Sequence, residues 1–379
     1  MILPSLMIGK KAKCLNCGKE SRKISSFLSL CRDCIINHFD ELKPIIMGIH
    51  ARARKAYNLP PYPPRSDKGV KCSLCANQCV ILKGEKGYCG LRENIKGRLH
   101  HISGTTNKGL LSFYFDPLPT NCVASFVCPA EVIKDKGWER YSYSKGAEYG
   151  YKNLAVFYES CSLNCLFCQN YHFKEANPYG KTISSDELVS QIDSRTACIC
   201  FFGGDPSTQA AHAINSAKKA LIKTKGRPFR ICFETNGQFN PKLMIQAAKL
   251  SYQSFGIVKF DLKAFDERIH IALTGISNKQ ILKNFKVVYE IGKDRREVPL
   301  LIASTLLIPG YVEEDEVRKI ARFIASIDPE IPYSLLAFYP HFFMDDMPTT
   351  KRETAELSLQ AAKEEGLKNV HIGNIHLLA

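Results

Sequence analysis

The sequence lacks any apolar run of the roughly 18–20 residues that a membrane-spanning helix requires. Its opening stretch, MILPSLMIGKKAK, places the apolar residues before the lysines, which is the reverse of a secretory signal. Acidic residues are scarce, with 37 Asp and Glu against 52 Lys and Arg, so the formal net charge is +15. We therefore expect an intracellular, cytoplasmic protein that has no membrane partner.

Cysteine is abundant, with 16 residues in a chain of 379. Hydrophobic residues make up 45% and charged residues 23%, which is typical of a folded globular protein and argues against a disordered one. The length indicates two or three domains. Inside the cell cysteines stay reduced, so tight cysteine clusters indicate metal binding or catalysis rather than disulfides.

The basic charge is concentrated near the N-terminus. Residues 1–71 contain fourteen Lys and Arg against five acids, and the segment HARARKAYNLPPYPPRSDKGVK mixes basic residues with Tyr and Pro. We predict that residues 46–71 form a basic, solvated, Pro-rich linker. The alternative is a surface that meets the phosphate backbone of RNA or an acidic protein face.

From about residue 151 the chain alternates between strand-like and helix-like segments. Apolar, β-branched runs occupy residues 153–158, 197–202, 230–235, 256–262, 299–308, 331–339 and 369–373. Near-continuous apolar strands separated by amphipathic helices predict an α/β fold with a parallel sheet. Six or seven such units favour a partial (β/α)6-type TIM barrel over residues 151–379, whose site lies at the C-terminal ends of the strands.

A short loop after the first of these strands, ESCSLNCLFCQN, contains Cys161, Cys165 and Cys168 in the spacing C-x3-C-x2-C. A structural zinc site uses four protein ligands, so three thiolates indicate a different group or a zinc ion completed by a remote ligand. Three thiolates can hold three irons of a [4Fe–4S] cluster and leave the fourth iron open. We therefore predict that these three cysteines are the catalytic cluster ligands.

With an aromatic residue at Phe167, this motif resembles the signature of the radical S-adenosylmethionine (radical SAM) superfamily. The resemblance implies that SAM completes the cluster and is reductively cleaved to a 5′-deoxyadenosyl radical, which abstracts hydrogen from a substrate. The segment FFGGDP is similar to the family's Gly-Gly-Glu-Pro segment, and CFETNG and VKFDLKAF are similar to its next strand ends. The cofactor-binding residues implied in this way are Phe167, Gly203, Gly204, Asp205, Pro206, Glu234, Thr235, Asn236, Asp261 and Lys263.

Residues 72–379 more narrowly resemble activating enzymes of the pyruvate formate-lyase type and their AmmeMemoRadiSam-type relatives. That resemblance implies an oxygen-sensitive oxidoreductase with an external one-electron reductant of the flavodoxin or ferredoxin type and a protein or peptide substrate. Two other hypotheses stay open, an RNA-modifying radical SAM enzyme and a non-enzymatic metal-binding adaptor. Cys122 and Cys128 depart from the family pattern, and the sequence assigns them no role.

The other cysteines form two spaced groups and three isolated positions. Residues 1–45 are predicted to form a zinc-ribbon-like module, with rubredoxin-type iron as the alternative metal; its four ligands are Cys14, Cys17, Cys31 and Cys34. A cysteine-rich segment, residues 72–150, is predicted to bind zinc or an auxiliary iron–sulfur cluster through Cys72, Cys75, Cys79 and Cys89. Cys198, Cys200 and Cys232 lie in apolar runs and are expected to be small core residues.

Overall fold

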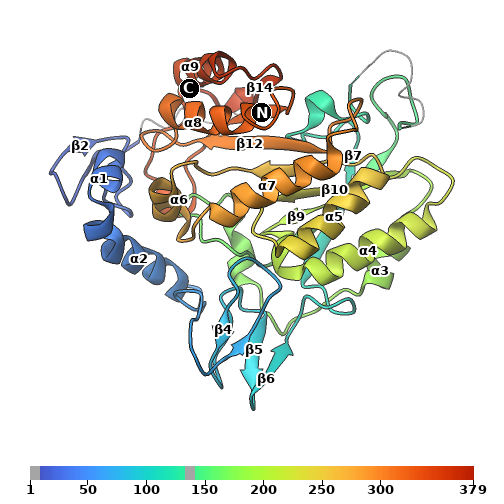
Figure 1. Ribbon diagram of the computed structural model, residues 1–379, viewed down its shortest axis with the longest axis horizontal. Coiled ribbons are helices and arrows are strands. Elements are labelled where there is room, and N and C mark those ends of the chain that lie inside the picture. The colour runs from blue at the N-terminus through green and yellow to red at the C-terminus, as the bar shows by residue number, and fades with distance from the viewer. Residues whose placement is uncertain (1–8, 133–140) are drawn as a thin grey trace.

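A central sheet of eight strands organises the molecule, seen in a computed structural model that describes residues 9–132 and 141–379 (Figure 1). Its strands lie in the order β14, β13, β12, β11, β10, β9, β8, β7. Strands β8 to β14 run parallel to their neighbours, and β7 pairs antiparallel with β8. Their bounds are β7 (Leu111–Pro117), β8 (Lys152–Tyr158), β9 (Thr196–Gly203), β10 (Arg230–Thr235), β11 (Val258–Asp261), β12 (Leu301–Leu307), β13 (Tyr333–Ala337) and β14 (Val370–Gly373).

The predicted parallel α/β fold is confirmed, and each of the seven strand-like segments contains one strand. Consecutive strands are neighbours. β7 and β14 lie at the two ends of the strand order and, in the part of the chain that the structure describes, do not pair with each other, so the sheet stays open. Strand β7 was not among the strands predicted from the sequence. It is an edge strand with several exposed positions, and its polar and aromatic residues do not form a continuous apolar run.

Helices cover the outer face of this sheet (Figure 1). One core forms between them, in which outward-facing strand residues such as Ile199 and Phe201 pack against the helices. Because side chains alternate along a strand, Cys198, Cys200 and Phe202 point to the inner face. The helices are α3 (Ser185–Ser190), α4 (Ala210–Lys223), α5 (Pro241–Gln253), α6 (Glu267–Thr274), α7 (Lys279–Gly292), α8 (Glu314–Ala325) and α9 (Arg352–Glu364).

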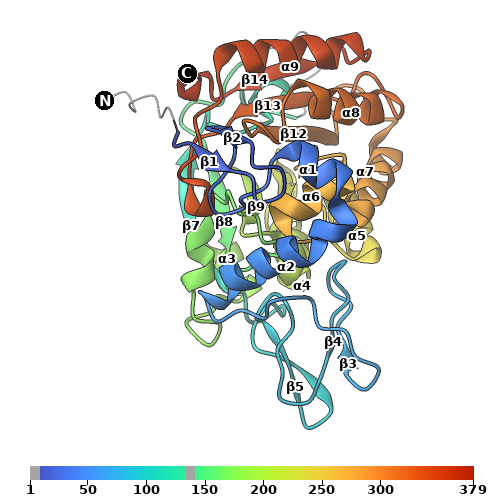
Figure 2. The same cartoon turned by 90° about the vertical axis from the view of Figure 1, so that its left-hand side faces the viewer.

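The N-terminal module lies against α6 at one side of the sheet (Figure 2). It contains β1 (Ala12–Lys13), β2 (Glu20–Ser21), α1 (Arg32–Asn37) and α2 (Phe39–Lys55). Helix α2 crosses the module boundary expected at residue 45, because its apolar positions, among them Ile46 and Ile49, belong to a second hydrophobic core. The predicted linker, residues 46–71, is therefore helical in its first part rather than solvated throughout.

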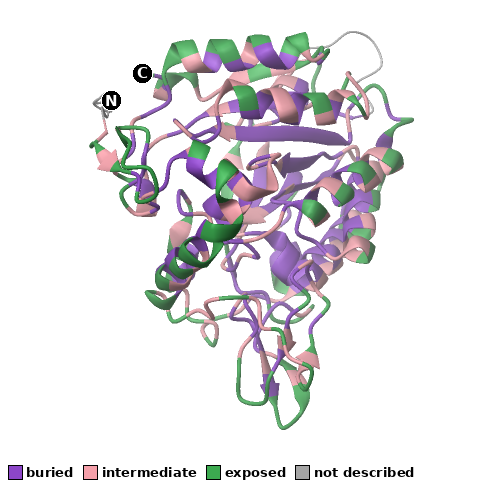
Figure 3. Ribbon diagram, turned by 60° about the vertical axis from the view of Figure 1, so that its left-hand side comes forward, coloured by how far each residue is buried: buried purple, intermediate pink, exposed green. Residues whose placement is uncertain are grey.

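Two small hairpins project from the other end of the molecule, and the turn of the second, residues 95–98, is exposed (Figure 3). They are β3 (Val70–Lys71) with β4 (Val80–Ile81) and β5 (Arg92–Ile95) with β6 (Arg98–His101). Short 3-10 helices complete the fold: η1 (Ser125–Val127), η2 (Tyr171–Glu175), η3 (Pro206–Gln209), η4 (Phe342–Met344) and η5 (Ile375–Leu377). Across the described residues, every helix is too short or too polar to cross a membrane.

Candidate functional site

A cavity of about 360 Å³ opens at the C-terminal ends of the strands, on the inner face of the sheet. Cys161, Cys165 and Cys168 all line it. Nine of the ten predicted cofactor-binding residues line it too, and Pro206 alone of that set does not. The fold therefore brings residues from the ends of β8, β9, β10 and β11 to one place.

The loop that contains Cys161, Cys165 and Cys168, residues 159–170, is called the cysteine loop. It is fixed by backbone hydrogen bonds to the end of α6. The Asn164 amide donates to the Thr274 carbonyl at 2.9 Å, and the Leu166 amide donates to the Leu273 carbonyl at 3.0 Å. Leu166 and Phe167 are buried in the second core, beside the N-terminal module. These contacts hold the loop so that its three thiols face the cavity.

Burial raises the pKa of each of the three thiols, that of Cys165 to about 12. Buried cations counteract this effect, since Lys263 lowers the pKa of Cys165 and Lys174 lowers that of Cys168. Burial in turn lowers the pKa of Lys174 to about 8. Three thiols next to the buried ammonium groups of Lys174 and Lys263 fit an anionic iron–sulfur group, because thiolates are the usual cluster ligands.

Two glycines let the loop after β9 approach the cysteine loop. Gly203 has φ +110°, and an added Cβ would lie 2.5 Å from the Tyr158 nitrogen. At Gly204 an added Cβ would lie 2.4 Å from the Ser160 carbonyl oxygen. Only glycine fits such close backbone approaches.

Asp205 is buried and ties two strand ends together. Its Oδ1 accepts from the Ser207 amide at 2.8 Å. Its Oδ2 accepts from Thr235 Oγ1 at 2.9 Å and from the Asn236 amide at 2.7 Å. The carboxylate that the sequence places among the cofactor contacts thus accepts three hydrogen bonds from protein donors.

Further polar groups of the cavity remain available to a ligand. Asp261 Oδ1 and Ser334 Oγ are buried, line the cavity and have no hydrogen-bond partner in the described structure. The other Asp261 oxygen pairs with Lys263. Asn236 Nδ2 donates to Ser162 Oγ at 3.2 Å and lies 3.5 Å from Cys161 Sγ. Buried polar atoms are normally satisfied, so the two orphaned oxygens fit a polar ligand such as SAM.

The N-terminal cysteines form a metal-ligand set. The sulfur atoms of Cys14, Cys17, Cys31 and Cys34 all lie within 4.8 Å of one another, and among the described residues this is the one group with that arrangement. Although burial raises it, the pKa of Cys14 falls to about 6, because backbone amides including that of Cys17 donate to its sulfur. This cluster fits the predicted zinc-ribbon-like module.

The second predicted metal site is not gathered in this way. Cys72, Cys75 and Cys79 are buried and Cys89 is half-buried, but the four sulfurs do not lie within 4.8 Å of one another. Their segment nevertheless packs behind the cysteine loop. Asn77 Nδ2 donates to the Ser162 carbonyl at 2.7 Å, and Ser160 Oγ donates to the Cys89 carbonyl at 3.1 Å.

One further correction concerns a buried arginine. Arg54, expected in a solvated linker, is buried; its guanidinium donates to the Pro60 and Tyr88 carbonyls, and its carbon lies 3.5 Å from the Tyr88 ring centroid. The isolated cysteines are buried as expected, but Cys200 faces inward onto Lys259. Lys259 was not among the residues predicted from the sequence, although its position two residues before Asp261 on a buried strand indicates that it lies near the site.

Known proteins are similar to the part of the chain that forms the central sheet and its cavity. Residues 155–324 match the family model of the Radical SAM superfamily. An uncharacterized protein of Methanocaldococcus jannaschii is 25% identical over 326 residues, 83% of this chain and 84% of that protein. A putative glycyl-radical enzyme activating enzyme of the same organism is 32% identical over 184 residues, 47% of this chain and 64% of that protein. The match thus spans less than two thirds of the named activating enzyme.

Among solved structures, a domain of pyruvate-formate lyase-activating enzyme from Bacteroides vulgatus aligns with 46% of this chain and 98% of that domain. The sequence identity is 24% and the TM-score is 0.37.

Proposed function

Given that the chain carries a radical SAM domain and is an enzyme, we propose that Cys161, Cys165 and Cys168 hold its catalytic [4Fe–4S] cluster. The cluster and SAM, which such a domain implies, supply one-electron reduction and hydrogen-atom abstraction from an unreactive C–H bond when bound. The observation that carries this proposal is the shared cavity, lined by three thiols and by residues from four successive strand ends.

The chain's own residues then have distinct tasks in that cavity. Asn236 orients the cysteine loop through Ser162, and Gly203 and Gly204 let the end of β9 pack directly against the backbone of Tyr158 and Ser160. Asp261 and Ser334 offer free polar oxygens to the bound cofactor.

The substrate class proposed for the chain is a protein or peptide, with an external one-electron reductant. The support is the relative named as a putative glycyl-radical enzyme activating enzyme, whose name refers to a protein substrate. RNA is no longer favoured. Arg54, one of the basic residues that would meet phosphates, is buried against the Tyr88 ring and donates to carbonyl groups.

The four N-terminal cysteines are proposed to bind zinc. Four thiolates that converge tetrahedrally are typical of structural zinc sites, and their sulfurs are already gathered. Cys72, Cys75, Cys79 and Cys89 are retained as a proposed site for zinc or an auxiliary cluster, because three of them are buried directly behind the cysteine loop.

The test of the catalytic proposal is SAM cleavage. Anaerobically reconstituted, dithionite-reduced protein should form 5′-deoxyadenosine and methionine, measured by liquid chromatography with mass spectrometry. The variant Cys161→Ala, Cys165→Ala, Cys168→Ala should lose this activity to background, because no thiolates remain to hold the cluster. Cys232→Ala, which removes a buried thiol outside the cavity lining, is the matched control. Undiminished cleavage in the triple variant would refute the assignment.

A further inference from the structure

Two buried cations lie behind the cysteine loop, outside the lining of the larger cavity. Arg54 belongs to α2 and is 1% exposed, and Lys174 belongs to η2 and is 6% exposed. Both line a second, small cavity of about 30 Å³, and Cys161 lines it with them. Neither cation lines the cavity at the strand ends. They therefore adjoin the cysteine loop from the protein interior, rather than from the space that a ligand would enter.

These two cations have no carboxylate partner among the described residues. The Arg54 guanidinium donates to two backbone carbonyls, and Lys174 Nζ donates to Asn164 Oδ1 at 2.8 Å. Glu159 is the one acid in the lining of the small cavity, and in the part of the chain that the structure describes it forms no ion pair with either cation. Buried charges are normally paired with an opposite charge. Two that are not paired indicate an anionic group beside them.

Both cations interact electrostatically with the thiols of the cysteine loop. Burial and Arg54 lower the pKa of Lys174, whereas all three loop thiols raise it. Burial also lowers the pKa of Arg54, and the Cys161 thiol is among the groups that raise it. Charges interact more strongly in a protein interior than in water, because the effective dielectric constant is lower. A negative charge held by the loop would therefore be stabilised by both residues.

The position of the Arg54 charge is fixed by its contacts. Its guanidinium carbon lies 3.5 Å from the Tyr88 ring centroid, and its nitrogens donate to the Pro60 and Tyr88 carbonyls. Helix α2 itself is held in the second hydrophobic core, which also contains Leu166 and Phe167 of the cysteine loop. The cation therefore cannot swing away to solvent, as an exposed arginine would.

We propose that Arg54 and Lys174 raise the reduction potential of the iron–sulfur cluster proposed at the cysteine loop, an inference that rests on the proposed function. Reduction adds one electron, supplied by the external reductant, and no bond to either residue forms or breaks. It thus adds one negative charge beside two fixed positive charges, which stabilise the reduced state more than the oxidised state. Net charge near a cluster is one of the properties that set its potential.

This inference gives the N-terminal part of the chain a function at the catalytic site. The resemblance to activating enzymes begins at residue 72, and Arg54 precedes it. One of the two charges is therefore supplied by a helix outside the segment that resembles those enzymes, whereas Lys174 follows the cysteine loop within it. Helix α2 then contributes to the electrostatics of the site as well as to the packing of the loop.

The midpoint potential of the cluster tests the inference without substrate or SAM cleavage. Anaerobically reconstituted protein is titrated electrochemically with redox mediators in the absence of SAM, and the reduced cluster is quantified by electron paramagnetic resonance. Lys174→Gln keeps a hydrogen-bond donor but loses the charge. At the wild-type midpoint its ratio of reduced to oxidised cluster should fall about tenfold, a shift of about 59 mV to lower potential for one electron. Arg54→Gln should shift the midpoint in the same direction.

Two variants separate charge from structure. Lys174→Arg keeps the charge and should recover most of the shift, whereas a purely structural role would make its shift as large as that of Lys174→Gln. Lys55→Gln is the matched control, since Lys55 follows Arg54 on α2 but is exposed, so that solvent and salt screen its charge; it should keep the wild-type midpoint.

The iron content of each variant decides how the titration is read. A wild-type midpoint in both neutral variants, at full iron content, would overturn the inference. Loss of iron from both would show that the charges hold the cluster rather than set its potential, and would overturn it as well. A wild-type protein that forms no reducible cluster, or a triple cysteine variant that still forms one, would instead overturn the proposed function itself.

Discussion

Asp205 shows how a single methylene group changes what a residue does. The resembling family segment has Glu at this position, whose longer side chain can reach further into a site. In this chain the shorter carboxylate caps η3 through the Ser207 amide and joins the end of β9 to the end of β10 through Thr235 and Asn236. Its role is to position the cavity wall rather than to offer a free oxygen to the cofactor.

Asp205→Asn should therefore destabilise the fold. An amide nitrogen at either oxygen position would face a backbone N–H donor, and the loss of a hydrogen bond to a buried charged group costs about 2–3 kcal/mol. The unfolding free energy from urea titration measures this directly. Asp345→Asn, at an exposed aspartate, should change it by less than about 0.5 kcal/mol. Equal stability of the two variants would contradict the positioning role.

At the scale of elements, the parallel strands could be predicted from the sequence, but the face of the sheet on which each side chain lies could not. Parallel strands buried on both faces read as continuous apolar runs, so all seven were visible in the sequence. The same continuity hides which face a residue occupies. Cys200 therefore looked like an ordinary core residue, although alternation from the outward-facing Phe201 places it beside Lys259. The cavity-lining thiol of Cys122 was hidden because the segment after β7 has no regular period.

The second half of helix α2 was predicted as linker, and its polar contacts explain its position. His50 Nε2 lies 3.0 Å from the Ala272 carbonyl oxygen, and His50 Nδ1 lies 2.9 Å from Asn164 Nδ2. Asn164 Oδ1 in turn accepts from Lys174 Nζ at 2.8 Å. A neutral imidazole, protonated on Nε2, satisfies every group in this series of hydrogen bonds. The series connects α2 to α6 and to the cysteine loop.

Acid should therefore loosen α2. Burial lowers the pKa of His50 from 6.5 to about 4, so its contribution is fully present above pH 6.5 and is lost as the pH falls toward 4. Between neutral pH and pH 5 the unfolding free energy should fall by about 2 kcal/mol from this residue alone. In the His50→Gln variant, the decrease in unfolding free energy between neutral pH and pH 5 should be smaller by about 2 kcal/mol. Urea titration at the two pH values measures it.

Two other histidines, His212 and His270, are also buried with pKa values lowered by burial to about 4. The His50→Gln variant should thus retain part of the acid sensitivity of the wild-type protein. His376→Gln, at an exposed position, is the control and should leave the fall unchanged. If the His50→Gln variant lost as much unfolding free energy between neutral pH and pH 5 as the wild-type protein, the imidazole would not be held neutral in the fold.

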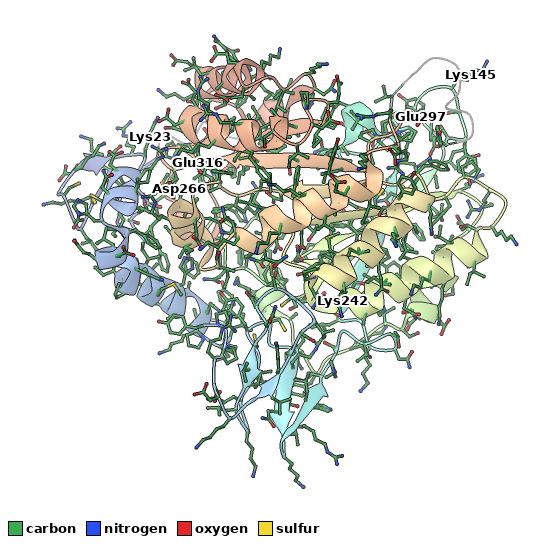
Figure 4. The ribbon with its side chains drawn as sticks, in the orientation of Figure 1. Lys23, Lys145, Lys242, Asp266, Glu297 and Glu316 are labelled. Carbon is green, nitrogen blue, oxygen red and sulfur yellow. The ribbon has the colours of Figure 1, made fainter. Side chains whose placement is uncertain are left out.

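At the scale of the whole molecule, the N-terminal module and the cysteine loop share one hydrophobic core. Cys14, Cys31 and Cys34 pack in the same cluster of buried residues as Leu166 and Phe167. Ion pairs secure the contact: Lys23 Nζ lies 2.7 Å from Glu313 Oε1, and Arg32 Nη2 lies 3.8 Å from Glu316 Oε2. Lys23 and Glu316 lie on the same side of the molecule, where the module meets the α/β part (Figure 4).

Loss of the metal proposed for the module should consequently affect the iron–sulfur cluster proposed at the cysteine loop. Cys17→Ser with Cys34→Ser removes two of the four proposed zinc ligands, so the zinc content should fall by about one equivalent. The module then lacks the metal that stabilises its small core. Because Leu166 and Phe167 then lose part of their packing, iron should leave the anaerobic protein about twofold faster or more, measured with a ferrous chelator. Cys128→Ser, outside the module, should keep both metals. Loss of zinc with unchanged iron release would show that the shared core does not couple the two sites. The expected coupling follows from the packing of Phe167, whose ring is buried against the module while its neighbour Cys168 faces the cavity.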